Sequence, residues 1–209
     1  MFKKKGILIV FEGIEGSGKS FHIKKLYKKI LKLKLPVIIT REPGGSESSE
    51  KIRNLILRGK KNKFHNLTDT LLYISSRNEN LRQTIIPNIL KKKIVICDRF
   101  VDSTIAYQSY GLGIKRQIIE KLHKVALNNI KPDFTFLLKL KINDSIKRIN
   151  KRQSKNRYDK FTKKFYTKVQ KGYLKISKNN KKYFVVNTSL NSKLVEALIY
   201  KRFLKLIKR

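Results

Sequence analysis

A glycine-rich segment near the N-terminus constrains the fold more than any other feature of the chain. Residues 13–20 read GIEGSGKS and fit the pattern G-x-x-x-x-G-K-S/T. An apolar stretch, GILIVFE at 6–12, comes before it, and a stretch with apolar residues at helical spacing, HIKKLYKKILKL, comes after it. A strand, a glycine loop and a helix in this order predict a phosphate-binding loop at the edge of an α/β sheet.

Each part of this loop predicts a contact with a bound nucleotide. The glycines let successive backbone N–H groups face the phosphates, Lys19 reaches the outer phosphates, and the Ser20 hydroxyl can ligate Mg²⁺. We therefore expect the nucleotide-binding residues to be Gly13, Ile14, Glu15, Gly16, Ser17, Gly18, Lys19 and Ser20.

Five apolar, β-branched runs indicate buried parallel strands. They cover 6–12, 36–40, 94–98, 134–140 and 183–187, and segments at helical spacing such as 118–130 separate them. This alternation is typical of a doubly wound α/β fold, so we expect a five-stranded parallel sheet flanked by helices. No repeat or Pro-, Gly- or Ser-rich linker interrupts the chain, which predicts one domain over residues 1–209.

The chain is strongly basic, with 51 Lys and Arg against 14 Asp and Glu and a formal net charge of +37. Such an excess ordinarily suggests a nucleic-acid or anionic-surface partner. Here the lysines are scattered over many polar segments, without a basic tail or an interleaved aromatic platform. Lys, Asn and Ile share A/T-rich codons, so drift in base composition explains the excess. We expect no specific nucleic-acid partner, and a basic nucleic-acid-associated protein with a phosphate loop stays open as an alternative.

No apolar run reaches the roughly 18 residues that a membrane-spanning helix needs. The N-terminal MFKKKGILIVFEG turns to glycine and glutamate before a signal peptide would be complete. We therefore expect a cytoplasmic protein without a membrane partner. The single cysteine, Cys97, lies in the apolar run IVIC and predicts a small buried side chain, because one cysteine can form no internal disulfide.

Charged residues stand at the ends of two predicted strands. Arg41 follows PVIIT, and Asp98 and Arg99 follow IVIC. Residues beyond the carboxyl ends of neighbouring parallel strands converge on one crevice, so we expect Arg41 and Arg99 to approach Lys19. Two arginines that face a phosphate loop predict a second substrate that carries phosphate. Asp98 can serve a metal site or cap the following helix, and the residues alone leave both roles open.

With these motifs in order, the chain resembles the bacterial thymidylate kinases. The resemblance rests on FEGIEGSGKS, TREPGG at 40–45, LLYISSR at 71–77, DRFVDSTIAYQ at 98–108 and KPDFTFLL at 131–138. It covers essentially the whole chain, although the last fifty or so residues match by pattern only. It implies a P-loop NTPase fold, a homodimer, and ATP- and Mg²⁺-dependent phosphorylation of dTMP to dTDP, a step toward dTTP.

The resemblance implies roles for the residues at the strand ends. Arg41 and Arg99 would clamp the dTMP phosphate with support from Arg53, and the planar guanidinium suits this bidentate contact. Asp98 would help Ser20 to hold Mg²⁺ and would orient the attacking phosphate.

The resemblance also implies a site for the base and the sugar of dTMP. Tyr73 and Arg77 lie four residues apart, on one helix face. The ring of Tyr73 would stack on thymine and Arg77 would contact its carbonyl edge, although Tyr73 as core packing stays open. Thr104 and Gln108 would bind the base edge, and Tyr107 would lie against the sugar.

Glu15 is unusual beside an anion, because its charge repels phosphate. The resemblance implies that members with an acidic residue here supply cations from a mobile lid, which we expect at about 148–160. Arg148, Arg152 and Arg157 are then the candidates for stabilising the charge of the transition state, and the sequence does not choose among them.

A second alternative is another nucleotide kinase, such as a deoxynucleoside kinase. Such an enzyme would not need an arginine clamp, because its acceptor carries no phosphate.

Overall fold

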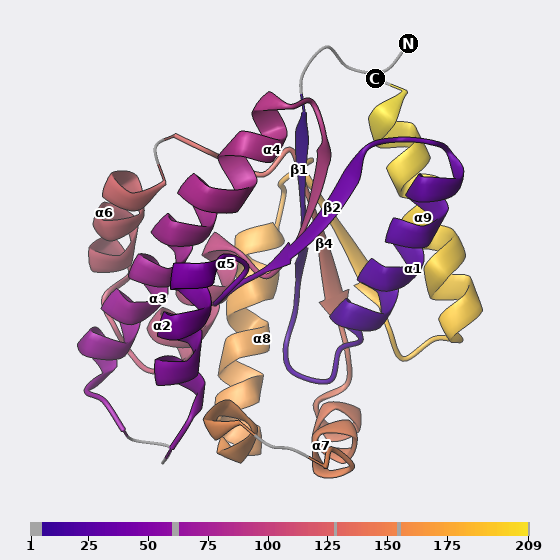
Figure 1. Ribbon diagram of the computed structural model, residues 1–209. Helices are drawn as coiled ribbons and strands as arrows, with labels where there is room; N and C mark the ends of the chain where they lie inside the picture. Colours follow the sequence, from indigo (N-terminus) through magenta and orange to yellow (C-terminus); the bar gives the residue numbers. More distant parts are fainter. Residues whose placement is uncertain (1–5, 60–62, 128, 154–155, 209) are drawn as a thin grey trace.

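The five apolar runs form one parallel sheet, as the sequence predicts, and its strand order is β2-β3-β1-β4-β5 (Figure 1). The strands are β1 (Ile7–Glu12), β2 (Val37–Arg41), β3 (Ile94–Asp98), β4 (Phe134–Lys139) and β5 (Tyr183–Asn187). The computed structural model describes residues 6–59, 63–127, 129–153 and 156–208. Within these ranges the predicted α/β class is confirmed, and strand bounds shift by one residue or less.

The central strand β1 shows why the sheet is covered on both faces. Ile7, Ile9 and Phe11 belong to one apolar cluster, whereas Leu8 and Val10 belong to another. Successive side chains of a strand point to opposite faces, so a continuous apolar run demands a layer of helices on each side.

Helices α1 (Lys19–Lys32) and α9 (Ser192–Ile207) cover one face. In α1 the buried apolar residues Ile23, Leu26 and Ile30 recur at intervals of three and four, which places them on one side of the helix. Figure 1 shows α1 and α9 together on one side of the sheet and the remaining larger helices on the other.

The opposite face carries the elements that shape the site. They are α2 (Glu47–Leu57), α3 (Asn66–Asn80), α4 (Ile86–Leu90), α5 (Val101–Thr104), α6 (Arg116–Ala126) and α8 (Lys163–Ser177). Two π-helical turns, η1 (Leu81–Ile85) and η2 (Ile105–Gly111), interrupt this layer, and no pattern in the sequence predicted them. Such turns are frequent at functional sites, and η2 carries part of the pocket described below.

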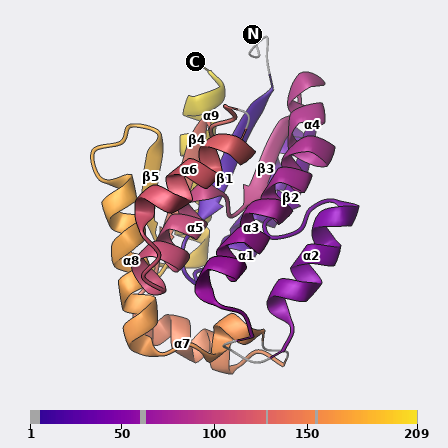
Figure 2. The ribbon, with the colours of Figure 1, turned by 90° about the vertical axis from the view of Figure 1, so that its left-hand side faces the viewer.

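The carboxyl ends of the strands point toward α7 (Ile142–Asn150) and the 3₁₀ turn η3 (Arg157–Lys160), as Figure 2 shows. The predicted lid, about 148–160, therefore runs from the end of α7 through η3, and residues 154 and 155 lie outside the described residues. No helix in the described part of the chain is long and apolar enough to cross a membrane.

Candidate active site

The glycine loop connects β1 to α1 at the centre of the sheet. Gly13 has φ 138°, and a Cβ atom there would lie 2.4 Å from the carbonyl oxygen of Leu138 on the neighbouring strand, so only glycine fits. Gly18 precedes α1 in the left-handed region, with φ 89°, and no side chain caps the helix. The first N–H groups of α1 thus have no side-chain partner at the cap, and the helix dipole favours an anion there.

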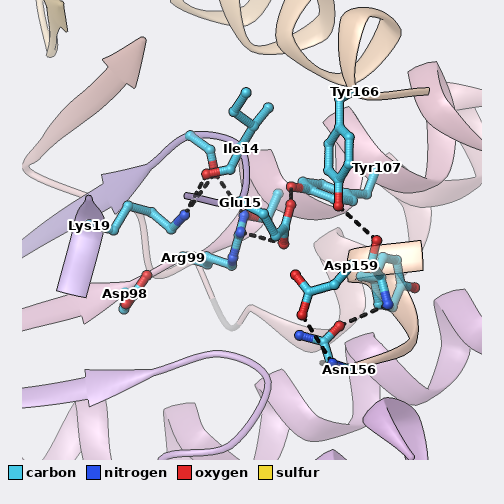
Figure 3. Close-up of polar contacts among 12 residues, drawn as sticks. Ile14, Glu15, Lys19, Asp98, Arg99, Tyr107, Asn156, Asp159 and Tyr166 are labelled. Carbon is cyan, nitrogen blue, oxygen red and sulfur yellow. Dashed lines mark hydrogen bonds and ion pairs between the residues drawn. The ribbon is translucent and has the colours of Figure 1, made fainter. Parts of the chain in front are cut away.

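Lys19 is folded back onto the loop. Its Nζ atom donates to the carbonyl oxygens of Gly13 and Ile14, each at 3.0 Å (Figure 3). Burial, together with the positive charge of Arg99, lowers the pKa of Lys19 to about 8. A phosphate anion in the loop would oppose this shift, because an opposite charge nearby favours the protonated amine.

Ser20 and Asp98 meet at the edge of the loop, where the Ser20 hydroxyl donates to Asp98 Oδ2 at 2.8 Å. Helix α5 begins at Val101 with Phe100 as its cap residue, so the alternative role of Asp98 as a helix cap is wrong. A hydroxyl and a carboxylate fit Mg²⁺, which usually takes one or two protein oxygens and completes its shell with phosphate and water. Among the described residues, no group of three or more His, Cys, Asp or Glu could hold a metal alone.

Arg99 lies between the loop and β3. Its guanidinium donates to Gly13 O at 2.9 Å and to Glu15 Oε1 at 2.7 Å. Glu15 also accepts a hydrogen bond from the Tyr107 hydroxyl (Figure 3). Burial alone would raise the pKa of Glu15, but the charges of Arg99 and Lys19 outweigh it and hold that pKa below its usual value. The acidic loop residue is therefore ionised and paired.

Two further arginines surround the turn after β2. Arg41 Nη2 contacts both carboxylate oxygens of Glu50, at 3.1 and 3.0 Å, and Arg53 donates to Pro43 O. Glu50 also accepts the backbone N–H of Gly45 at 2.9 Å. Arg41 is more than half exposed, so its guanidinium can reach a ligand from the mouth of the site.

A pocket of about 250 Å³ joins these groups, and it contains most of the residues that the sequence predicted. The predicted residues that line it are Glu15, Lys19, Ser20, Arg41, Arg53, Tyr73, Asp98, Arg99, Thr104, Tyr107, Gln108 and Arg152. Residues that the sequence analysis missed are Glu42, Pro43, Leu57, Ser103, Asn156 and Tyr158. Arg41 and Arg99 thus share one pocket with Lys19, as the strand-end argument expects.

Aromatic rings form one wall of this pocket. Tyr158 from η3 meets Tyr73 and Tyr107 edge-to-face, with ring centroids 5.9 Å apart in both pairs. The Gln108 amide donates to the Tyr158 hydroxyl at 3.3 Å. Flat rings beside an amide suit a planar base that needs stacking and hydrogen bonds. Tyr158 lies in the basic lid segment. The one sequence signal for its role is an aromatic residue among charged neighbours.

Arg77 is not on the pocket wall, although the resemblance places it at the base edge. It is 1% exposed, and its guanidinium donates to Glu42, to Phe100 O and to Thr104 Oγ1. It also lies 2.7 Å from His123 Nε2, and burial together with the charge of Arg77 lowers the pKa of His123 to about 2. Arg77 therefore holds Thr104, which does line the pocket.

The three lid arginines occupy different places. Arg152 lines the pocket, and its side chain, 39% exposed, contacts Asp159 at 2.8 Å. Arg148 is exposed, donates to Gly16 O at 3.0 Å and does not line the pocket. Arg157 is buried and forms an ion pair with Asp69 of α3. Only Arg152 of the three faces the pocket.

The chain is similar to known proteins over nearly its whole length. The family described as Thymidylate kinase matches residues 11–199. A thymidylate kinase of Sulfurihydrogenibium sp. (strain YO3AOP1) is 40% identical over 87% of this chain and 88% of its own length, and one of Wolbachia pipientis wMel is 41% identical over 82% and 85%. The crystal structure of thymidylate kinase from Ehrlichia chaffeensis superposes with a TM-score of 0.74 at 32% identity, covering 95% of this chain and 98% of that one.

Proposed function

The chain belongs to the thymidylate kinase family, and we propose that it transfers the γ-phosphoryl group of ATP to dTMP, giving ADP and dTDP. The observation that carries the proposal is one pocket that holds a phosphate loop together with Arg41, Arg53 and Arg99. Two phosphorylated substrates that must meet head to head need cations at both phosphates, because their charges repel each other.

ATP would bind with its phosphates along the loop of residues 13–20. The loop N–H groups and Lys19 would hold the β- and γ-phosphates, and Arg148 would remain beside the loop, near Gly16. Ser20 and Asp98 would hold Mg²⁺, which neutralises charge on the nucleotide phosphates when bound.

dTMP would bind in the other half of the pocket. Arg41, Arg53 and Arg99 would contact its phosphate, with Asp98 orienting the attacking oxygen. The base would lie against Tyr73, near Thr104 and Gln108, whereas the sugar would lie against Tyr107. Arg77 would act on the base site through Thr104, which it holds at 2.9 Å.

In the reaction, an oxygen of the dTMP phosphate forms a bond to the γ-phosphorus while the bond from that phosphorus to the bridging β–γ oxygen breaks. The protein contributes alignment and charge stabilisation rather than a covalent group. Arg152 is the lid arginine best placed to stabilise the moving phosphoryl group, since it lines the pocket.

We also propose that residues 1–209 form one kinase domain with the lid at about 148–160, and that two copies form a homodimer in the cytoplasm. Support for the dimer comes from large apolar side chains exposed on α2, α3 and α6. These are Leu55, Leu67, Leu71, Ile118 and Val125. Light scattering after gel filtration distinguishes a dimer from a 24.6 kDa monomer.

A coupled assay of ADP release tests the function. The purified chain, ATP and Mg²⁺ are combined with dTMP, dUMP, dCMP, dAMP, dGMP or unphosphorylated thymidine. We expect dTMP to give the highest kcat/KM and thymidine to give no turnover. Turnover of thymidine without turnover of dTMP would instead identify a deoxynucleoside kinase.

A further inference from the structure

The carboxylate of Glu12, at the end of β1, is fully buried and is not among the residues that line the pocket. Its Oε1 atom accepts the backbone N–H groups of Phe100 at 2.8 Å and Ser103 at 3.2 Å. Its Oε2 atom accepts the Ser103 hydroxyl at 2.6 Å and the Tyr173 hydroxyl at 3.1 Å. Four donors thus converge on one buried side chain, and the residue that supplies two of them, Ser103, lines the pocket.

The same two hydroxyls contact Arg99. Its Nη1 atom lies 3.1 Å from the Tyr173 hydroxyl and 3.3 Å from the Ser103 hydroxyl. A hydroxyl has a single proton, so a hydroxyl that donates to Glu12 presents its lone pairs to the arginine. Tyr173 and Ser103 are also 2.7 Å apart, and the protons of both therefore run toward the carboxylate, directly or through each other.

The backbone at Arg99 needs external support as well. Its φ angle is 74°, in the left-handed region that a residue with a Cβ atom adopts only when its surroundings hold it there. The next N–H group along the chain, that of Phe100, donates to Glu12. The same carboxylate therefore supports both the backbone and the guanidinium of Arg99.

We propose that Glu12 is a positioning residue for Arg99, which it holds against the phosphate loop through the hydroxyls of Ser103 and Tyr173. The inference rests on the proposed function, in which Arg99 contacts the phosphate of dTMP. It assigns to Glu12 an effect on dTMP and on the transfer step, and little effect on the binding of ATP.

The charge of Glu12 matters for this arrangement. Burial, and then the negative charge of Asp102, raise the pKa of Glu12 to about 7. A protonated Glu12 would donate to one of the hydroxyls and reverse the direction of the hydrogen bonds toward Arg99. The ionisable groups that interact with it are Arg99 before α5, Asp102 of α5, Lys19 of α1, Cys97 of β3, Tyr173 of α8 and Tyr183 of β5.

Glu12→Gln tests the proposal, with Asp133→Asn as a matched control. Both changes replace a carboxylate that accepts a backbone N–H, and both keep an oxygen acceptor. Asp133 accepts the N–H of Leu8 at 2.9 Å, so it supports the same strand away from the pocket. Each change is also made in an Arg99→Ala background.

We expect Glu12→Gln to lower kcat/KM for dTMP by roughly 10- to 100-fold, the loss expected for a hydrogen-bond chain to a charged group. The KM for ATP should stay within about twofold, because only the dTMP side of the site is displaced. Asp133→Asn should leave both constants within about twofold. In the Arg99→Ala background, Glu12→Gln should lower kcat/KM for dTMP by less than about threefold, because the guanidinium through which Glu12 acts is absent.

The pH profile gives an independent readout. The wild-type chain should lose kcat/KM for dTMP as the pH falls through about 7, where Glu12 takes up its proton. The dTMP phosphate also titrates near this pH in every variant, so the comparison is the ratio of wild type to Glu12→Gln. That ratio should fall toward one at pH 6.

Three results would overturn the role of Glu12: an unchanged kcat/KM in Glu12→Gln, an equal loss in Asp133→Asn, or the same loss with and without Arg99. Urea unfolding of the wild-type chain, Glu12→Gln, Arg99→Ala and the double variant forms a double-mutant cycle that needs no substrate. A coupling of roughly 2- to 100-fold in the unfolding constant between residues 12 and 99 supports the contact, and no coupling overturns it. Failure of the wild-type chain to phosphorylate dTMP would overturn the proposed function instead.

Discussion

Replacing Arg77 tests whether its primary task is to hold the pocket together. In Arg77→Met the apolar volume of the side chain is largely kept, whereas every hydrogen bond of the guanidinium is lost. Glu42 accepts a hydrogen bond from Arg77 Nε at 2.6 Å, and its side chain is only 3% exposed. Burial already raises the pKa of Glu42 against the opposing charge of Arg77, so the variant leaves a buried carboxylate without its cation.

Removing one partner of a buried ion pair destabilises a protein by about 3–5 kcal/mol. For a chain of this length, each kcal/mol lowers Tm by roughly 2–4 °C, so we expect a decrease of about 6–20 °C. Arg82→Ala removes the same charge from an exposed site in the neighbouring helical turn, and it should lower Tm by less than about 2 °C.

The deficit of Arg77→Met should also depend on pH. Without Arg77, the folded state favours protonated Glu42, so its folded pKa lies above the unfolded value. Stability of the variant then increases as the pH falls through that folded pKa, because the folded chain binds the additional proton. Scanning calorimetry from pH 8 to pH 5.5 measures the difference in Tm between the wild-type chain and Arg77→Met. If Tm decreases by less than 2 °C at pH 8, or if the Tm difference increases toward low pH, Glu42 does not depend on Arg77 for its charge compensation.

Three further predictions concern the pocket itself. Arg99→Ala should lower kcat with dTMP about 30- to 1000-fold in steady-state assays, the effect of losing roughly 2–4 kcal/mol of charge-assisted contact, and a value within threefold of wild type would remove Arg99 from the phosphate site. Tyr107→Ala should let the ribonucleotide analogue compete better than it does in wild type, and unchanged discrimination in that competition assay would exclude Tyr107 from the sugar site. Weak DNA binding should collapse between 50 and 200 mM salt while turnover of dTMP largely persists, because counterion release governs only the former; DNA binding at 200 mM salt without kinase activity would favour a nucleic-acid function.

The sheet could be predicted because buried parallel strands have continuous apolar sequences. The loop could be predicted because its glycines, Lys19 and Ser20 are adjacent in the sequence. Strand order and the π-helical turns depend on packing between distant segments, and no local pattern encodes them. The pocket position of Arg41 and Arg99 followed from the rule that parallel strands end at one edge.

Long-range contacts explain what the sequence could not give. Glu12 follows an apolar run, so the sequence indicates only that it is the polar end of a strand. Its partners Phe100 and Tyr173 lie 88 and 161 residues further along the chain, so their convergence is a property of the fold alone. For Arg77, in contrast, the resemblance predicts a contact with the base edge. In the structure its guanidinium donates to Glu42, Thr104 and Phe100 O within the protein.

The lid arginines show how burial separates residues of one type. Arg157 and Asp69 are both buried, and Tyr158, which adjoins Arg157, donates to the same Asp69 at 2.7 Å. Moving Arg157 to a phosphate would break this pair and leave Asp69 with an uncompensated charge, at a cost of several kcal/mol. Arg152 is 39% exposed and can leave Asp159 without first being taken out of a buried site, and the Asp159 carboxylate, although buried, still accepts the Asn156 N–H at 3.0 Å. The free-energy difference favours Arg152 as the cation that approaches the transferred phosphoryl group, with Arg157 fixing the aromatic wall beside the base.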